Sequence, residues 1–159
     1  MENQEEKRML PQNLRDLLKD IGESSVLFQI YTKIYSTDWQ AFKNLSHAGC
    51  DIVLLNLTIN KIIKVEVKTR QSLYTTASSK NTLNQIEFSV TNNEYNEMDL
   101  LIAYWYDYNA HFVIPKISLK KSKNKYKMKI NLNNDGSFGS KSIYLNNWEP
   151  LLNLIATTN

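Results

Sequence analysis

An aspartate, a glutamate and a lysine occur together within residues 49–70, GCDIVLLNLTINKIIKVEVKTR. Asp51 opens an apolar run, and Glu66 and Lys68 alternate with valines in a second run. The two runs predict a β-hairpin with its turn near Ile59-Asn60. Carboxylates supply hard oxygen ligands for a divalent cation, and a neighbouring ammonium stabilises developing negative charge. This stretch therefore predicts a site for chemistry on phosphate groups.

The strand pairing of this hairpin decides whether the three side chains meet. Side chains alternate along a strand, so Glu66 and Lys68 share one face and the valines share the other. A two-residue turn at Ile59-Asn60 places Asp51 opposite Lys68, on that same face. An odd-length turn without a bulge moves Asp51 to the other face. The alternative reading of Glu66 and Lys68 is a solvent-facing pair worth about 0.5 kcal/mol.

The segment before the hairpin predicts two helices. A first amphipathic helix is indicated by apolar residues at helical spacing, namely Leu14, Leu17, Leu18 and Ile21. Gly22 interrupts this pattern, and Ser24 or Ser25 can cap a second helix that runs to about Tyr35. The buried side of the second helix is predicted to hold Leu27, Ile30 and Ile34. Residues 36–50 predict a loop.

The remainder of the chain predicts a mixture of strands and helices. A Ser-, Thr- and Asn-rich segment at 71–85 predicts a mobile loop. Strands are predicted at 86–90, 100–106, 111–115, 123–132 and 141–145. A short helix or turn is predicted at 91–98, and a helix capped by Asn147 at 148–156. Because no repeat or linker interrupts this order, we expect one α/β domain of residues 1–159, with residues 1–9 as a flexible tail.

Composition argues against several classes of protein. No run approaches the ~20 apolar residues that cross a bilayer, so we expect no membrane partner. Cys50 is the single cysteine, which excludes an intrachain disulfide and a Cys-based zinc site. No G-x-x-x-x-G-K-[ST] loop is present, and we expect no nucleoside triphosphate as a partner. The charged start MENQEEKRML is unlike a signal peptide, which favours a cytoplasmic location.

Positive charge is concentrated late in the chain. Lysines recur at every second position, at Lys121, Lys123, Lys125, Lys127 and Lys129. Two interpretations of this lysine comb stay open: contacts with a phosphate backbone, or protection of an edge strand against aggregation. Arg70 and Lys80, in or beside the polar loop after the hairpin, are further candidates for nucleic-acid contacts.

Asp51, fourteen intervening residues and Glu66-Val67-Lys68 resemble the signature of the PD-(D/E)XK, or restriction-endonuclease-like, nucleases. Cys50 replaces the proline that precedes the aspartate in that family. IGESSVLFQIY resembles the first core helix of the family, and FSVTNNEYNEMDLLIAYWY resembles its third strand, helix and fourth strand. The resemblance covers about residues 20–115.

This resemblance implies a restriction-endonuclease-like core, with a central mixed β-sheet flanked by helices. It implies a Mg²⁺-dependent endodeoxyribonuclease, with Mn²⁺ as a substitute, whose partner is DNA and which works as a homodimer. Asp51, Glu66 and the Val67 backbone carbonyl are the implied metal ligands, and Lys68 is implied to assist the attacking water. The alternative is a non-catalytic nucleic-acid-binding or assembly module that retains the fold.

Glu23 is a fourth candidate for the site. It falls at helical spacing with Leu27, Ile30 and Ile34, on the apolar side of the predicted helix. A carboxylate that faces a core needs a partner. The resemblance supplies a metal or its water and makes Glu23 an auxiliary acid. The other reading places Glu23 in the first turn of a helix, where the macrodipole favours an acid.

Overall fold

The computed structural model describes residues 10–46, 49–72 and 84–157. The elements in chain order are α1 (Gln12–Ile34), β1 (Gln40–Lys43), β2 (Ile52–Asn56), β3 (Lys61–Arg70), β4 (Gln85–Thr91), α2 (Asn92–Glu97), β5 (Leu100–Trp105), η1 (Tyr106–Tyr108), β6 (Ala110–Pro115), η2 (Lys116–Ser118), β7 (Lys120–Ser122), β8 (Lys125–Asn131), η3 (Gly139–Tyr144) and α3 (Glu149–Ala156), where η marks a 3₁₀ helix.

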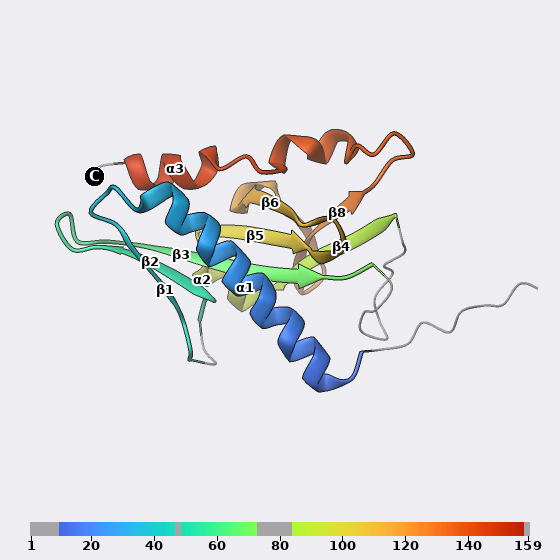
Figure 1. Ribbon diagram of the computed structural model, residues 1–159, viewed down its shortest axis with the longest axis horizontal. Helices are drawn as coiled ribbons and strands as arrows, with labels where there is room; N and C mark the ends of the chain where they lie inside the picture. The colour runs from blue at the N-terminus through green and yellow to red at the C-terminus, as the bar shows by residue number, and fades with distance from the viewer. Residues whose placement is uncertain (1–9, 47–48, 73–83, 158–159) are drawn as a thin grey trace, which may run out of the picture.

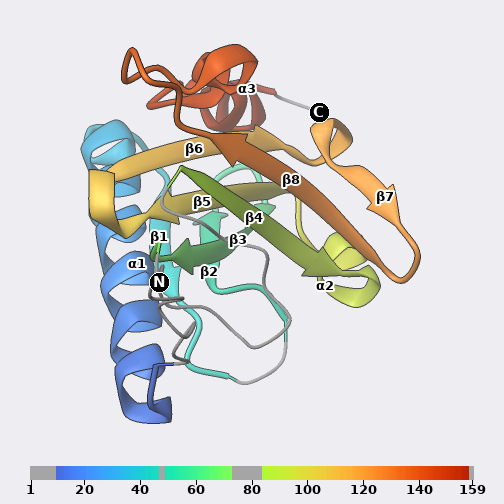
Figure 2. The same ribbon diagram turned by 90° about the vertical axis from the view of Figure 1, so that its right-hand side faces the viewer.

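Helices and two sheets form three layers (Figures 1 and 2). The larger sheet has the strand order β1-β2-β3-β5-β6, and β3 and β5 are its parallel pair. The helices α1 and α3 pack on one face of it, and the smaller sheet, β4-β8-β7, packs on the other. The predicted fold class, a mixed sheet flanked by helices, is confirmed.

Apolar side chains fill both spaces between the layers. On the helix side, Val65 and Val67 of β3 pack with Ile30 of α1, as the alternation along the strand predicted. Between the sheets, Trp105 of β5 packs with Phe88 of β4. Burial of these side chains supplies the main stabilising term of the fold. None of the helices in the described ranges combines the length and apolar character that a membrane crossing requires.

Helix α1 is continuous, so the predicted break at Gly22 is wrong. Gly22 lies where α1 crosses β3, and a Cβ atom there would lie 1.6 Å from Oγ1 of Thr69. Glycine is therefore required for the close approach of helix and strand, not for the end of a helix. Three residues of the predicted first stripe are more than two-fifths exposed, namely Leu14, Leu17 and Ile21. Ile30 and Ile34 are buried, as predicted.

The turn between β2 and β3 has four residues, 57–60, so the predicted two-residue turn is wrong. Asn56 pairs with Lys61, and its Oδ1 accepts hydrogen bonds from the amides of Thr58 and Ile59 at 3.0 and 3.2 Å. This side chain satisfies turn amides and so stabilises the longer turn.

The longer turn shifts the pairing of the two strands by two residues. Ile52 pairs with Val65, so the register brings Asp51 to the level of Glu66 instead of Lys68. Because side chains alternate with a period of two, a shift of two residues leaves every side chain on its predicted face. Asp51, Glu66 and Lys68 therefore still share one face of the hairpin.

Three other predictions are wrong. The predicted loop at 36–50 contains β1, which forms an edge of the larger sheet. The predicted strand at 141–145 is mostly the 3₁₀ helix η3, and Leu145 alone forms a bridge, with Phe112. The edge-strand interpretation of the lysine comb fails for β8, which lies between β4 and β7, whereas Lys121 lies on β7, an edge of the smaller sheet. The other predicted strands and helices occur close to their predicted ranges, whereas residues 1–9 and most of the predicted loop at 71–85 lie outside the described residues.

Replacing Gly22 by alanine tests the close approach of α1 to β3. Alanine favours a helix, but its Cβ collides with Thr69, so we expect Gly22→Ala to lower the free energy of unfolding by about 1–3 kcal/mol. Thermal and denaturant unfolding measure the change. Oγ1 of Thr69 is buried without a hydrogen bond within the described structure, so adding Thr69→Ala should recover part of the loss.

Ser24→Ala, at an exposed position of the same helix, is the matched control and should not destabilise the protein. Equal unfolding free energies for wild type and Gly22→Ala would contradict the proposed packing constraint.

Candidate active site

Glu66, which is buried, and Lys68, which is partly buried, form an ion pair on β3. Glu66 is 3% exposed, and its Oε1 lies 2.6 Å from Nζ of Lys68. The same ammonium lies 2.8 Å from Oε1 of Glu94, on α2. Lys68 therefore links β3 of the larger sheet to α2, the helix that directly follows β4 of the smaller sheet.

The surroundings of Glu66, Lys68 and Glu94 change the pKa values of all three side chains. Burial raises the pKa of Glu66 to about 7, against the opposing charge of Lys68 and with a contribution from Asp51. Burial works to lower the pKa of Lys68, but the carboxylates of Glu66 and Glu94 outweigh it and raise that pKa. For Glu94, burial is outweighed by the hydrogen bond from Lys68, and the pKa is lowered. Lys68 is therefore held as an ammonium ion, with Glu94 as its charged partner.

Glu94 has a second role at the start of α2. Its Oε2 accepts a hydrogen bond from the amide of Thr91 at 2.7 Å, and the Thr91 hydroxyl accepts one from the amide of Glu94 at 3.2 Å. This capping box fixes the first turn of the helix and the position of the carboxylate. The sequence T-N-N-E carries the capping signal, but no local pattern shows that Glu94 reaches Lys68.

Asp51 is held at the start of β2 by its own backbone and side chain. Gly49, with φ of +89°, turns the chain just before it, a conformation that favours glycine. The backbone oxygen of Asp51 accepts a hydrogen bond from the amide of Asn44 at 2.7 Å, and its Oδ2 accepts one from the amide of Val67 at 2.8 Å. The side chain is thus tied to the strand that carries Glu66. Its Oδ1 lies 3.6 Å from Nζ of Lys19.

Glu23 lies on α1 and is 3% exposed. It follows the first helical residue, Gln12, by eleven positions, so the first-turn reading is wrong. Its two carboxylate oxygens lie 3.4 Å from Nζ of Lys19 and 3.0 Å from Nζ of Lys43. Lys19 therefore bridges Glu23 and Asp51, which brings the predicted auxiliary acid next to the hairpin site.

The acidic cluster, defined as Glu23, Asp51, Glu66 and Glu94, is neutralised in part by lysines that the sequence did not indicate. Three lysines contact these acids, namely Lys19, Lys43 and Lys68, and of them only Lys68 was predicted from the sequence. Lys43 also contacts Asp20, at 2.7 Å. Lysines link the acids of this cluster, but in the part of the chain that the structure describes no three acidic, His or Cys side chains lie close enough together to hold one metal ion. Mg²⁺, however, keeps several waters and takes one or two protein carboxylates. The oxygen donors of Asp51 and Glu66 fit that requirement.

The predicted nucleic-acid contacts lie at different places. Arg70 is on β3 two positions beyond Lys68, its Nη1 donates to the backbone oxygen of Thr69 at 2.9 Å, and burial lowers its pKa. Lys80 lies outside the described residues. The structure does not bring the lysine comb to the acidic cluster: Lys125 and Lys127 instead pair with Glu87 at 3.0 and 3.1 Å.

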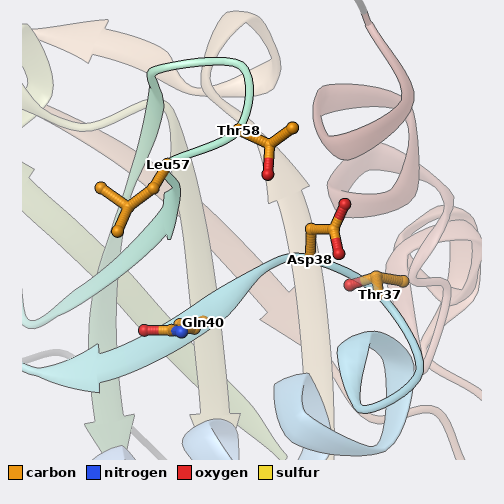
Figure 3. A pocket seen from close by; sticks show the side chains of 5 residues that line it. All are labelled: Thr37, Asp38, Gln40, Leu57 and Thr58. Carbon is orange, nitrogen blue, oxygen red and sulfur yellow. The ribbon is translucent and has the colours of Figure 1, made fainter.

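A separate hollow of about 320 Å³ opens at the other end of β2 (Figure 3). Thr37, Asp38 and Gln40 line it from the connection after α1 and from β1, and Leu57 and Thr58 line it from the turn after β2. Asp51 stands at the opposite end of the same strand, so this hollow does not include the acidic cluster.

Comparisons with known proteins identify the fold. A scan against protein-family models and a search of curated proteins each found no match. The structure is similar to that of a bacterial homing endonuclease, I-Ssp6803I, with a TM-score of 0.59 and 19% sequence identity over 89% of this chain and 95% of that chain.

A second similar structure is that of Hjc, a Holliday junction resolvase from the archaeal hyperthermophile Archaeoglobus fulgidus. Its TM-score is 0.45 and its identity 13%, over 68% of this chain and 83% of that chain. At these identities the similarity is one of fold, and the homing endonuclease carries it. The predicted restriction-endonuclease-like fold is confirmed.

Glu66→Gln tests whether burial of this carboxylate opposes folding. The amide keeps the shape of the side chain and removes a charge that lies in the protein interior beside Asp51, while Lys68 keeps Glu94 as its partner. In the presence of a chelator at mildly alkaline pH, we expect the melting temperature to rise by about 2 °C or more, which corresponds to roughly 1 kcal/mol.

Asp38→Asn changes an exposed carboxylate and is the matched control, for which we expect no comparable rise. A lower melting temperature for Glu66→Gln than for Asp38→Asn would show that the charge of Glu66 stabilises the fold.

Proposed function

We propose that this chain, whose fold is that of the restriction-endonuclease-like nucleases, is a Mg²⁺-dependent endonuclease that hydrolyses phosphodiester bonds of DNA. The observation that carries the proposal is the shared face of the β2–β3 hairpin, where Asp51 stands at the level of Glu66 and Lys68 contacts Glu66 at 2.6 Å. A bacterial homing endonuclease with a similar structure supports the proposed reaction class.

Asp51 and Glu66 are the residues that would hold the divalent cation, with the backbone carbonyl of Val67 as a further ligand. Their hard oxygen atoms suit Mg²⁺, and Mn²⁺ accepts the same donors. A cation bound there would supply Lewis-acid stabilisation of the charge that builds on the phosphate oxygens. Lys19, whose side chain is 64% exposed, can leave Asp51 for solvent when the cation binds.

Lys68 is proposed to assist the attack of water on the phosphate. Its ammonium group is fixed from two sides by Glu66 and Glu94, so little reorganisation is needed when negative charge develops nearby. Glu94 acts through Lys68 and is proposed as a positioning residue. Glu23 is proposed as the auxiliary acid, since it reaches the site through Lys19.

The state of assembly and the cut produced are also proposals. A single site of this kind cuts one strand, so we propose that two copies form a homodimer to cut both strands of a duplex. The binding-module alternative requires no metal and no turnover, and the experiments below separate it from the nuclease.

Asp51→Asn and Lys68→Met test the proposed roles. The asparagine side chain is isosteric with aspartate and can still accept from the amide of Val67, so the fold should persist while Mg²⁺ affinity falls. Lys68→Met removes the ammonium group and keeps an unbranched side chain that is shorter by one atom, and cleavage should fall by about 100-fold or more. Cleavage of supercoiled and linear DNA in Mg²⁺ gives the rates, and calorimetric titration gives the Mg²⁺ affinity.

Both variants should bind DNA in Ca²⁺ nearly as well as wild type. Because Lys68 is mostly buried, melting curves must confirm that Lys68→Met is folded at the assay temperature. Wild type that binds DNA but shows no Mg²⁺- or Mn²⁺-dependent cleavage of duplex, single-stranded or branched DNA would leave the binding module as the function.

Glu94→Gln tests the positioning role. Glutamine preserves the capping box, because its oxygen can accept from the amide of Thr91, but it removes the negative charge beside Lys68. We expect kcat to fall by about 10-fold with KM nearly unchanged, the scale seen when a group behind a catalytic site is altered.

Glu97→Gln, on an exposed position of the same helix, is the control and should retain wild-type kcat. An unchanged kcat in a folded Glu94→Gln protein would restrict Glu94 to the capping of α2.

A further inference from the structure

A hollow of about 260 Å³ on the smaller sheet carries most of the excess positive charge of this protein. Four lysines line it, together with Glu87, Ser118 and Met128, and the lysines are Lys120, Lys127, Lys129 and Lys141. Four ammonium groups and one carboxylate give a net charge of +3, which equals the formal charge of the whole chain. The rest of the chain is therefore neutral overall. We call this surface the lysine hollow.

Strand alternation and register build the lysine hollow. On β8 the side chains of Met128 and Ile130 point into the core between the sheets, so Lys127 and Lys129 point away from it. The register places Lys120 of β7 directly opposite Lys127, and Glu87 of β4 opposite Lys129. Three strands thus present their charged side chains on one face.

Three members of the predicted lysine comb, Lys121, Lys123 and Lys125, do not line this hollow, and Lys125 pairs with Glu87 at its side. Lys121 pairs with Tyr126 and so lies on the other face of the sheet, 6.0 Å from that ring. Lys123 lies in the turn between β7 and β8, with φ of +52°. Lys141, which does join, comes from η3 and was not a candidate from the sequence.

One acid, Glu87, serves the four lysines of this surface, so most of their charge is not balanced by an ion pair. Glu87 pairs with Lys125 and Lys127. Within the described residues, Lys120, Lys129 and Lys141 form no ion pair. Lys120 and Lys127 are also direct cross-strand neighbours, an arrangement of like charges that opposes sheet formation. A bound anion would remove this repulsion, so the geometry indicates a ligand with several negative charges.

We propose that the lysine hollow binds phosphate groups of a nucleic-acid backbone, as a contact surface separate from the acidic cluster. Lysine contacts phosphate as a point charge, without reading bases. No aromatic side chain lines the hollow, so it offers no platform on which a base could stack. The choice of nucleic acid as the source of these phosphates rests on the proposed function, whereas the anion site itself does not.

The hollow and the acidic cluster are built from different elements. Lysines and Glu87 of the smaller sheet and Lys141 of η3 line the hollow, whereas Asp51, Glu66 and Lys68 belong to the β2–β3 hairpin. A phosphate contact at the hollow would therefore add affinity without taking part in the chemistry at the hairpin.

The test measures binding of a fluorescein-labelled DNA duplex to the full chain in Ca²⁺ over a series of KCl concentrations. In the triple variant Lys120→Gln, Lys129→Gln and Lys141→Gln, we expect affinity to fall by about 10-fold or more. The slope of log affinity against log salt should decrease by about two to three, since each phosphate contact contributes about 0.9. Melting curves should show an intact fold, because Lys120 and Lys129 are exposed.

A charge-matched pair of single variants controls for net charge. Lys129→Glu changes the hollow, and Lys33→Glu makes the same change on α1, in the layer beyond the larger sheet. We expect Lys129→Glu to weaken duplex binding by several-fold and Lys33→Glu by less than about twofold. Equal losses in the two variants, or wild-type affinity and slope in the triple variant, would overturn the proposal.

Inorganic phosphate distinguishes a backbone from a small phosphate ligand. At matched ionic strength, phosphate should not displace the duplex from wild type, because several backbone contacts act together. If phosphate displaces the duplex at low millimolar concentration from wild type but not from the triple variant, the hollow is a small-anion site and the backbone proposal fails.

Cleavage assays separate failure of this inference from failure of the proposed function. Asp51→Asn should bind the duplex through an unchanged lysine hollow. A wild type that does not cleave, together with a triple variant that loses binding, would refute the nuclease and support the contact surface. If wild type cleaves DNA and the triple variant binds the duplex with wild-type affinity, the nuclease proposal is supported and the lysine hollow is refuted as a contact surface.

Discussion

The ion pair between the buried Glu66 and the partly buried Lys68 constrains the residues around it. A carboxylate that is 3% exposed inside a sheet needs a compensating cation, and the neighbouring position on the same face of β3 supplies one. The lysine in turn needs more than one acceptor, and Glu94 provides the second while it caps α2. The path of the chain from β4 into α2 is therefore coupled to the chemistry of β3.

A second constraint is the close contact of α1 with β3. Because Gly22 has no side chain, the helix approaches Thr69 closely enough to place the next residue, Glu23, beside the hairpin. Lys19 then lies between Glu23 and Asp51 and balances part of their charge. Buried and mutually repelling carboxylates oppose stability, and proteins retain such groups where function requires them. The structure thus places its least favourable charges at the proposed active site.

Charge is divided between two faces of the molecule. The acidic cluster retains more carboxylates than ammonium groups and favours a cation, whereas the lysine hollow favours an anion. Both surfaces draw a carboxylate from the segment of β4 and α2, Glu87 for the hollow and Glu94 for the acidic cluster. A net charge of +3 for the chain conceals this separation, which matters more for association with a polyanion than the total does.

The sequence by itself determined the features that depend on local periodicity. Alternation along 61–70 put Glu66 and Lys68 on one face, and it survived an error of two residues in the register because the period is two. Contacts between distant segments depended on how the layers pack. From the sequence, Gly22 indicated a helix break, whereas its role is to allow the close contact of α1 with β3. No local pattern indicates that Glu94 contacts Lys68 or that Lys141 lines the lysine hollow. Only the tertiary structure decided these, because residues far apart in the chain meet only when apolar burial brings the layers together.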